Sequence, residues 1–234
     1  MVKHKSLEPL DSSQKLKKIK QQDDMLESEL TLPIEPKLLV EQDGVVKYYP
    51  SVFGVAESGK LYDSLTTLEY WNRPQLKGYG HVKAQSRLTC AFGDDPNIEY
   101  NYSGTTAKVA SNYPDTVIEI KSKVEKLIGT KFNFCLLNFY TDGNEYIGAH
   151  SDNQAGLVPG APIAAVSLGA ERFLDFKHKK NNLKVRVTME SGSLLVMAGD
   201  TQSYWKHMIP KQKKVNAGRI SLTFRVVESN PSKS

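Results

Sequence analysis

The feature that most limits the fold is a series of short β segments that begins after Gly129 and fills the C-terminal half of the chain. Each segment is apolar or alternates between apolar and polar residues. Gly, Asn, Asp or Pro bound each segment, which is typical of short strands joined by turns. The segments are 132–140, 163–168, 172–176, 184–189, 193–197 and 219–226. This density of strands favours a jelly roll, or double-stranded β-helix, over a parallel α/β sheet.

Two helices and further strand-like residues are expected before this series. Residues 58–71 have large apolar side chains at helical spacing, with Ser58 as the expected N-cap. A second helix follows Pro114; it has Val117, Ile120 and Val124 on one face and ends at Gly129. Residues 45–50 are strand-like. The predicted fold class is therefore mainly β with flanking helices (α+β).

The chain divides by composition into a domain and two tails. Residues 1–36 are rich in Lys, Gln, Asp, Glu and Ser, and we expect a mobile N-terminal tail there. Residues 37–228 are expected to form one domain, with a short C-terminal tail at 229–234. No apolar run is long enough to span a bilayer, and no signal peptide is recognised, so we expect an intracellular protein without membrane partners.

Two sequence features concern the compartment. Cys90 and Cys135 lie in strand-like segments, where buried free thiols are expected, in keeping with a reducing compartment. The basic run 15–20 is either a nuclear signal or an ordinary charged run. With that alternative open, we expect the nucleus rather than the cytoplasm.

The charge is modestly positive and clustered. Formal net charge is +5 and the pI is about 9.0. Basic residues gather at 177–186 and 206–219. A solvated loop would explain either run alone, but two runs beside one chemical motif favour contact with phosphates.

That motif is a pair of histidines with a carboxylate. His150 and Asp152 are two positions apart, so both side chains point to one side of an extended segment. His207 lies far downstream. Two histidines and one carboxylate are the ligands of non-haem Fe(II) oxygenases, which leave open metal positions for a co-substrate and O2. His-x-Asp alone is common, so the prediction depends on the residues around it.

The surrounding residues supply partners for an anionic co-substrate. Arg219 and Arg225 are six apart on a predicted strand and therefore share a face. A buried arginine is costly unless it pairs with an anion, and a dicarboxylate co-substrate would be such an anion. Asn138 and Tyr140 share a face of another strand upstream of His150. Their amide and phenol are suitable donors for the same molecule.

In this order and spacing the chain resembles the AlkB family of nucleic-acid dealkylases, most of all its second and third human members. The resemblance covers residues 61–227 and is most specific at 86–93, 132–152, 162–170 and 219–225. It implies Fe(II) held by His150, Asp152 and His207. It also implies 2-oxoglutarate bound by Asn138, Tyr140, Arg219 and Arg225, with O2 as the second co-substrate. The implied fold is the double-stranded β-helix of the 2-oxoglutarate oxygenase type.

The resemblance also implies the reaction and the substrate contacts. The reaction is oxidative demethylation of bases such as 1-methyladenine or 3-methylcytosine, coupled to decarboxylation of 2-oxoglutarate to succinate. The chain has Asn153 and Gln154 where relatives have acidic residues, so the resemblance leaves the lesion range open. The expected substrate-binding residues are Tyr79, Arg87, Tyr100, Tyr102, Ser103 and Gln154.

Among these residues, the aromatic ring of Tyr102 is expected to stack on an extruded base opposite His150. Tyr79, between Gly78 and Gly80, is either a wedge at a hairpin tip or an ordinary turn residue.

Two alternatives remain open. One is an oxygenase of the same fold that acts on protein side chains or small molecules. The other is a nucleic-acid-binding module that has lost activity; an intact triad argues against it. The expected partner is alkylated DNA, double- or single-stranded, with RNA as a further option, and we expect a monomer.

Overall fold

The computed structural model describes residues 34–78, 81–95, 98, 100–102, 105–153 and 156–228. The compact unit that contains almost all of them begins at Pro36. The mobile tail expected at 1–36 lies outside the described residues up to position 33, as does the C-terminal tail at 229–234. In the described part of the chain, no helix has the length and apolar character needed to cross a membrane.

A large sheet forms one side of the fold. Its strand order is β1-β2-β14-β11-β16-β9-β5-β8, and neighbours pair antiparallel except for β5 and β8. The strands are β1 (Lys37–Val40), β2 (Val45–Tyr49), β14 (Ser193–Ala198), β11 (Ile163–Gly169), β16 (Arg219–Arg225), β9 (Phe134–Tyr140), β5 (Leu88–Gly93) and β8 (Val109–Ala110). Strands distant in the sequence are therefore neighbours, as a jelly roll requires.

A smaller sheet faces the first one. Its order is β10 (Ile147–His150), β15 (Trp205–Ile209), β12 (Arg172–His178) and β13 (Lys184–Met189), all antiparallel. The six β segments expected after Gly129 are confirmed as β9, β11, β12, β13, β14 and β16, with ends that differ by two residues at most.

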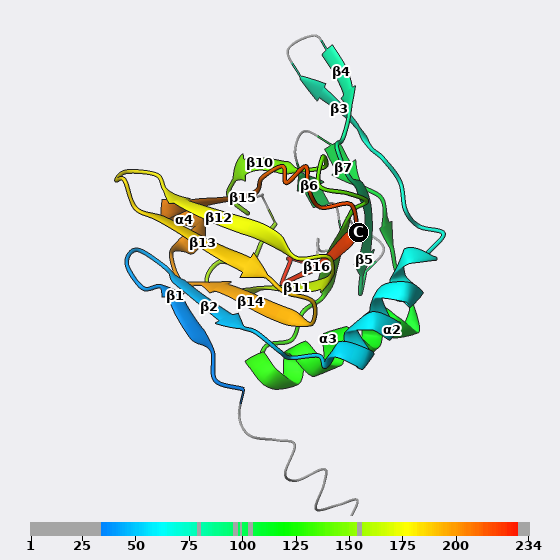
Figure 1. The fold of residues 1–234 in the computed structure, drawn as a ribbon, viewed down its shortest axis with the longest axis horizontal. Helices are drawn as coiled ribbons and strands as arrows, with labels where there is room; N and C mark the ends of the chain where they lie inside the picture. Colours follow the sequence, from blue (N-terminus) through cyan, green and yellow to red (C-terminus); the bar gives the residue numbers. More distant parts are fainter. Residues whose placement is uncertain are drawn as a thin grey trace, which may run out of the picture. The chain divides into compact units, whose positions relative to one another are not determined.

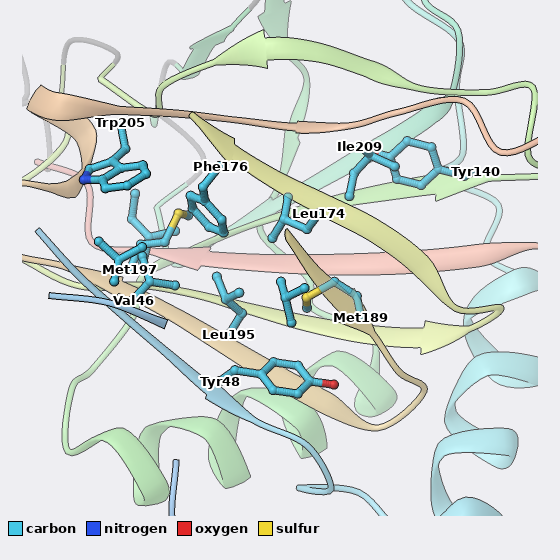
Figure 2. Packing of buried hydrophobic residues seen from close by; sticks show 13 residues of the cluster. Val46, Tyr48, Tyr140, Leu174, Phe176, Met189, Leu195, Met197, Trp205 and Ile209 are labelled. Atoms are coloured by element: carbon cyan, nitrogen blue, oxygen red, sulfur yellow. The ribbon is translucent and has the colours of Figure 1, made fainter. Parts of the chain in front are cut away.

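The main apolar core lies between the two sheets. Figure 2 shows Tyr48 and Leu195 from the large sheet in one cluster with Leu174 and Phe176 from the small one. Alternate residues of each strand face this core because side chains alternate across a strand. The predicted mainly β fold of the jelly-roll type is confirmed.

Two helices lie beside the large sheet on the side away from this core (Figure 1), and α2 packs against β11 and α3. Helix α3 (Asp115–Ile128) follows Pro114 and ends at Gly129, whose φ of 72° is the left-handed conformation that glycine adopts readily. The apolar face predicted for α3 is confirmed, since Val117, Ile120 and Val124 are fully buried.

The predicted start and end of the first helix were wrong. Helix α2 spans Val55–Thr66, with Gly54 rather than Ser58 at its N-cap. The Glu57 carboxylate accepts a hydrogen bond from the Gly54 N–H at 3.2 Å, which favours the earlier start. At the other end, the Trp71 indole N–H donates to the Leu65 carbonyl, so the chain turns back before 71.

Two hairpins and one short helix complete the fold. They are β3 (Gln75–Gly78) with β4 (His81–Ala84), β6 (Tyr100–Tyr102) with β7 (Thr105–Ala107), and the one-turn α4 (Thr201–Tyr204). The hairpin expected around Gly78 is confirmed by the antiparallel pairing of β3 and β4. Figure 1 shows it extending from the sheets at the top of the view, and β3 contacts β7 at its base.

The two cysteines are free and buried, as expected. Burial raises the pKa of both thiols, so they remain protonated and unreactive at neutral pH.

Candidate metal centre

Pairing of β10 with β15 brings the two predicted histidines together. His150 is the register partner of His207, and their ring centroids are 4.3 Å apart. Asp152 follows β10, and its Oδ1 lies 3.5 Å from His150 Nε2 and 4.0 Å from His207 Nε2. One potential ligand atom from each of the three lies within 4.8 Å of the others, which a single metal ion can bridge.

Each side chain is held in a state suited to binding a cation. Burial lowers the pKa of His207 to about 4, so its imidazole is neutral at physiological pH. His150 Nδ1 lies 2.9 Å from the Gly148 carbonyl. A carbonyl can only accept, so Nδ1 is the donor of this contact, and Nε2 is the ring nitrogen that faces Asp152, 3.5 Å from its Oδ1.

Asp152 is ionised despite being only 3% exposed. Burial alone would raise its pKa, but the Arg225 guanidinium and the two histidines hold it well below its usual range. Arg225 Nη2 donates to Asp152 Oδ2 at 2.6 Å. One carboxylate oxygen is thereby occupied, and the other faces the histidines.

The backbone around Asp152 is fixed by residues that sequence reasoning missed. Gln202 in α4 accepts a hydrogen bond from the Asp152 N–H through Oε1 at 2.7 Å, and the Ser151 hydroxyl donates to the Trp205 carbonyl. Neither contact has a local signal in the sequence. They arise because the chain after β10 runs beside the segment that leads into β15.

The predicted co-substrate residues line the same pocket as the triad. Asn138 and Tyr140 enter from β9, and Arg219 and Arg225 from β16. The side chains that form the apolar wall are Leu136, Ile147, Leu174, Met189, Leu195, Met197 and Ile209. Tertiary folding thus brings together the seven residues predicted to bind iron and 2-oxoglutarate.

Arg219 is a buried cation with an unfilled hydrogen-bond donor, which is what a site for an anion requires. It is 3% exposed, and its Nε donates to the Ser167 hydroxyl at 2.9 Å. Within the described residues, its Nη1 has no hydrogen-bond partner. Burial lowers the pKa of Arg219 to about 10, which still leaves it charged at neutral pH. A buried cation with an unfilled donor fits a carboxylate ligand.

Arg87 lies deeper than its expected substrate role suggested. It is 4% exposed, lines the pocket, and donates from Nε to Asn138 Oδ1 at 2.6 Å. Arg87 therefore contacts one of the predicted co-substrate residues directly. Its role toward substrate stays a prediction.

The other predicted substrate residues are described in part or not at all. Tyr79, Ser103 and Gln154 lie outside the described residues. Tyr100 and Tyr102 are in β6, two positions apart on one strand face, and the structure describes their backbone only.

The outer face of the small sheet carries a row of lysines. Lys177 in β12 is the register partner of Lys206 in β15 and of Lys184 in β13, and all three are exposed. Like charges directly opposite one another destabilise a sheet. An anionic partner along this row would relieve that repulsion.

Comparison with known proteins places these features in a family. A family described as "2OG-Fe(II) oxygenase superfamily" matches residues 45–225. The human protein named "DNA oxidative demethylase ALKBH2" is 36% identical over 202 residues, which cover 80% of this chain and 76% of that one. The rat "Alpha-ketoglutarate-dependent dioxygenase alkB homolog 3" is 33% identical over 192 residues, or 78% of this chain and 64% of that one.

Solved structures agree at the level of the fold. The structure described as "The structure of OsALKBH1" has a TM-score of 0.54 and 18% identity, and the match covers 77% of this chain and 97% of that one. At this identity the likeness supports the fold alone.

Proposed function

We propose that this chain, which belongs to the 2OG-Fe(II) oxygenase superfamily, removes N-alkyl groups from nucleic-acid bases by oxidising them. The observation that carries the proposal is one pocket that contains both the His150–Asp152–His207 cluster and the unfilled donor of Arg219. A metal ligand set and a carboxylate anchor in one apolar pocket fit an Fe(II) and 2-oxoglutarate enzyme.

The donors present suit the metal and the co-substrate. His150, Asp152 and His207 would hold Fe(II), and Arg219 would bind the far carboxylate of 2-oxoglutarate, with Asn138 and Tyr140 beside it. When bound, iron, 2-oxoglutarate and O2 supply the oxidation, in which 2-oxoglutarate is decarboxylated to succinate while the N-alkyl carbon is hydroxylated and then lost as an aldehyde.

The protein side chains orient these groups and exclude water. Arg225 holds Asp152 Oδ2 and so directs Oδ1 toward the histidines. The Ser167 hydroxyl accepts a hydrogen bond from Arg219 Nε and so fixes the arginine side chain, which leaves Arg219 Nη1 for a ligand. The apolar wall around them strengthens each of these electrostatic contacts.

Nucleic acid is the substrate class that the surface favours. The aligned lysines Lys206, Lys177 and Lys184 form a row of positive charge that suits a phosphate backbone. Relatives named as DNA demethylases are 35–36% identical to this chain over the aligned residues. An oxygenase of small molecules would gain nothing from such a row. We further propose that residues 37–228 form the catalytic unit, that it acts as a monomer, and that alkylated DNA is preferred over RNA.

A base in a duplex must leave the stack to reach a buried metal, at a cost of a few kcal/mol. We propose that the β6–β7 hairpin receives the extruded base, with Tyr102 stacked on it opposite His150. Base–aromatic stacking is worth about 1–3 kcal/mol and offsets part of that cost.

The test is mass spectrometry of 1-methyladenine oligonucleotides, single- and double-stranded, DNA and RNA, with Fe(II), ascorbate and 2-oxoglutarate. We expect loss of the methyl mass together with stoichiometric succinate, and neither product from Asp152→Ala. A methylated peptide is the matched substrate for the alternative oxygenase. Succinate formation with the peptide and none with any oligonucleotide would overturn the proposal.

A further inference from the structure

A further buried arginine, in addition to Arg87, Arg219 and Arg225, is the first residue of β12. Arg172 is 1% exposed and is the largest fully buried side chain in the described part of the chain. Its Nε donates to the Gln212 side-chain oxygen, Nη1 to the Asp142 carbonyl, and Nη2 to the carbonyls of Glu145 and Pro210, over 2.7–3.2 Å. All four acceptors are neutral. The carboxylates of Asp142 and Glu145 favour the charged form of Arg172 and offset part of the cost of burying it, but its hydrogen bonds go to neutral groups.

The four acceptors come from two loops that are far apart in the sequence. Asp142 and Glu145 lie between β9 and β10, and Pro210 and Gln212 lie between β15 and β16. The first loop thus joins the strand of Asn138 and Tyr140 to the strand of His150. The second joins the strand of His207 to the strand of Arg219. Arg172 is the point at which these two connections meet.

The two loops also touch backbone to backbone beside Arg172. The Gly143 N–H donates to the Val215 carbonyl at 2.7 Å, and the Gln212 N–H donates to the Gly143 carbonyl at 2.8 Å. A Cβ at position 143 would lie 1.9 Å from the Gln212 carbonyl oxygen. Glycine is therefore required for this approach, and the two loops form one hydrogen-bonded unit.

The unit extends to the base of the β3–β4 hairpin. Glu145 accepts from Arg73 Nη2 at 2.6 Å and from the Thr141 N–H at 2.7 Å. Arg73 Nη1 in turn donates to the Gln85 carbonyl, directly after β4. The hairpin base, the β9–β10 loop and the β15–β16 loop are thus tied together around a buried guanidinium.

The outer side of this unit is basic. Lys211, Lys213 and Lys214 in the β15–β16 loop are all exposed. Lys211 Nζ lies 4.9 Å from the ring centroid of Tyr146 in the opposite loop, so even an exposed lysine is in contact with the partner segment. The position of the Lys211 charge is therefore set by how the two loops dock, and Lys213 and Lys214 follow it in the same loop.

We propose that Arg172 is a positioning residue for the nucleic-acid substrate: it locks the two loops together and so fixes Lys211, Lys213 and Lys214 where they meet substrate phosphates. The inference rests on the proposed function, since it needs a polyanionic substrate. Arginine is suited to the task because its planar fork offers five donors at fixed angles, whereas lysine offers three from a single point.

The test compares Arg172→Lys, which keeps the charge but loses the fork, with Gln212→Met, which removes one acceptor and leaves every charge in place. Binding of 1-methyladenine oligonucleotides is measured by fluorescence anisotropy over a salt series, with Mn(II) in place of Fe(II) to prevent turnover. We expect about five- to tenfold weaker binding at low salt. The plot of log affinity against log salt should become shallower, with a slope smaller in magnitude by about one to two. Each lost phosphate contact reduces the magnitude of the slope by about 0.7–0.9.

Steady-state kinetics separate positioning from a defect in the catalytic pocket. For Gln212→Met we expect the KM for oligonucleotide to rise about fivefold or more, with the 2-oxoglutarate KM and kcat unchanged. A rise in the 2-oxoglutarate KM with an unchanged oligonucleotide KM would overturn the proposal, because the defect would then lie at the co-substrate.

Two further variants separate the effect of loop docking from a general loss of stability and from the loss of one charge. Leu65→Ala removes a fully buried side chain from α2 and so lowers stability away from these loops; it should leave the salt slope at the wild-type value. Lys213→Gln removes one loop charge directly and should lower the slope. If Arg172 acts through the loop, Lys213→Gln should have a smaller effect in the Arg172→Lys background than in the wild type. Additive effects, or an unchanged slope in both Arg172→Lys and Gln212→Met, would overturn the inference.

Failure of the proposed function has a different signature. A wild-type protein that binds the oligonucleotides but does not demethylate them would refute the reaction, and the salt slopes would still decide the role of Arg172. A wild-type protein that binds no oligonucleotide would overturn the inference itself.

Discussion

Arg225 donates from Nη2 to Oδ2 of Asp152 over 2.6 Å, and both side chains are buried. The bond joins the last residue of β16 to a loop residue 73 positions earlier, and it decides which oxygen of Asp152 faces the two histidines. Arg225 was predicted as a contact of 2-oxoglutarate. That role stays a prediction, while the contact with Asp152 gives Arg225 a direct part in orienting a metal ligand.

Removing one ligand of the triad should abolish turnover without unfolding the protein. Asp152→Ala and His207→Ala each take one donor from the metal, and we expect no succinate above background from either. Circular dichroism and Mn(II) binding by electron paramagnetic resonance check the fold and the metal separately. Succinate production at the wild-type rate by either variant would refute the assignment of the triad.

Arg219 should determine the KM of the enzyme for 2-oxoglutarate. Truncating one partner of a buried charge pair costs about 2–5 kcal/mol, so Arg219→Ala should raise the 2-oxoglutarate KM about 30-fold or more. Arg186, which is exposed and paired with Asp175, is the matched control, and Arg186→Ala should leave that KM unchanged. An unchanged KM in Arg219→Ala would mean that another cation anchors the co-substrate.

The depressed pKa of His207 predicts a pH-dependent stability of the metal-free protein. Between the ordinary histidine pKa of about 6.5 and the folded value of about 4, the unfolded chain binds a proton that the folded protein does not. Stability is therefore full above pH 6.5 and is lost as the pH falls toward 4. Between pH 6.5 and 4, the free energy of unfolding of His207→Gln should therefore fall by about 3 kcal/mol less than that of the wild type.

Urea unfolding of both apo proteins at several pH values measures this difference. The lowered pKa of Asp152 acts in a separate window, because its carboxylate begins to take up protons in the unfolded chain only near pH 4. Parallel stability curves for His207→Gln and wild type between pH 4 and 6.5 would contradict the prediction.

Tyr79 tests whether the β3–β4 hairpin serves duplex substrates. If the Tyr79 ring fills the space left by an extruded base, it should stabilise the transition state for duplex substrates by about 1.4 kcal/mol. Tyr79→Ala should then slow repair of double-stranded DNA about tenfold. Repair of the matching single strand should stay near the wild-type rate, since no stacked gap is left there. Equal losses on both substrates would assign Tyr79 to the fold of the hairpin instead.

The sequence predicted those parts of the site that depend on local spacing. His150 and Asp152 two apart, Asn138 and Tyr140 two apart, and Arg219 and Arg225 six apart each share a strand face by the period of a β-strand alone. The same reasoning located α3, because a terminal glycine and a helical apolar stripe are local signals. It misplaced α2, where Ser58 resembled an N-cap but the Glu57 carboxylate selected the earlier start.

The strand series, the metal ligand set and the basic character of the chain were thus determined by the sequence itself, since each depends on residue identity and on periods of a few residues. Tertiary structure alone decided that Arg225 holds Asp152, that Gln202 holds its backbone, and that Arg172 joins two loops. These contacts join positions 27 to 73 residues apart. The contacts of Asp152 depend on sheet register, and those of Arg172 also depend on the close approach of two loops at Gly143; a linear pattern has no signal for either.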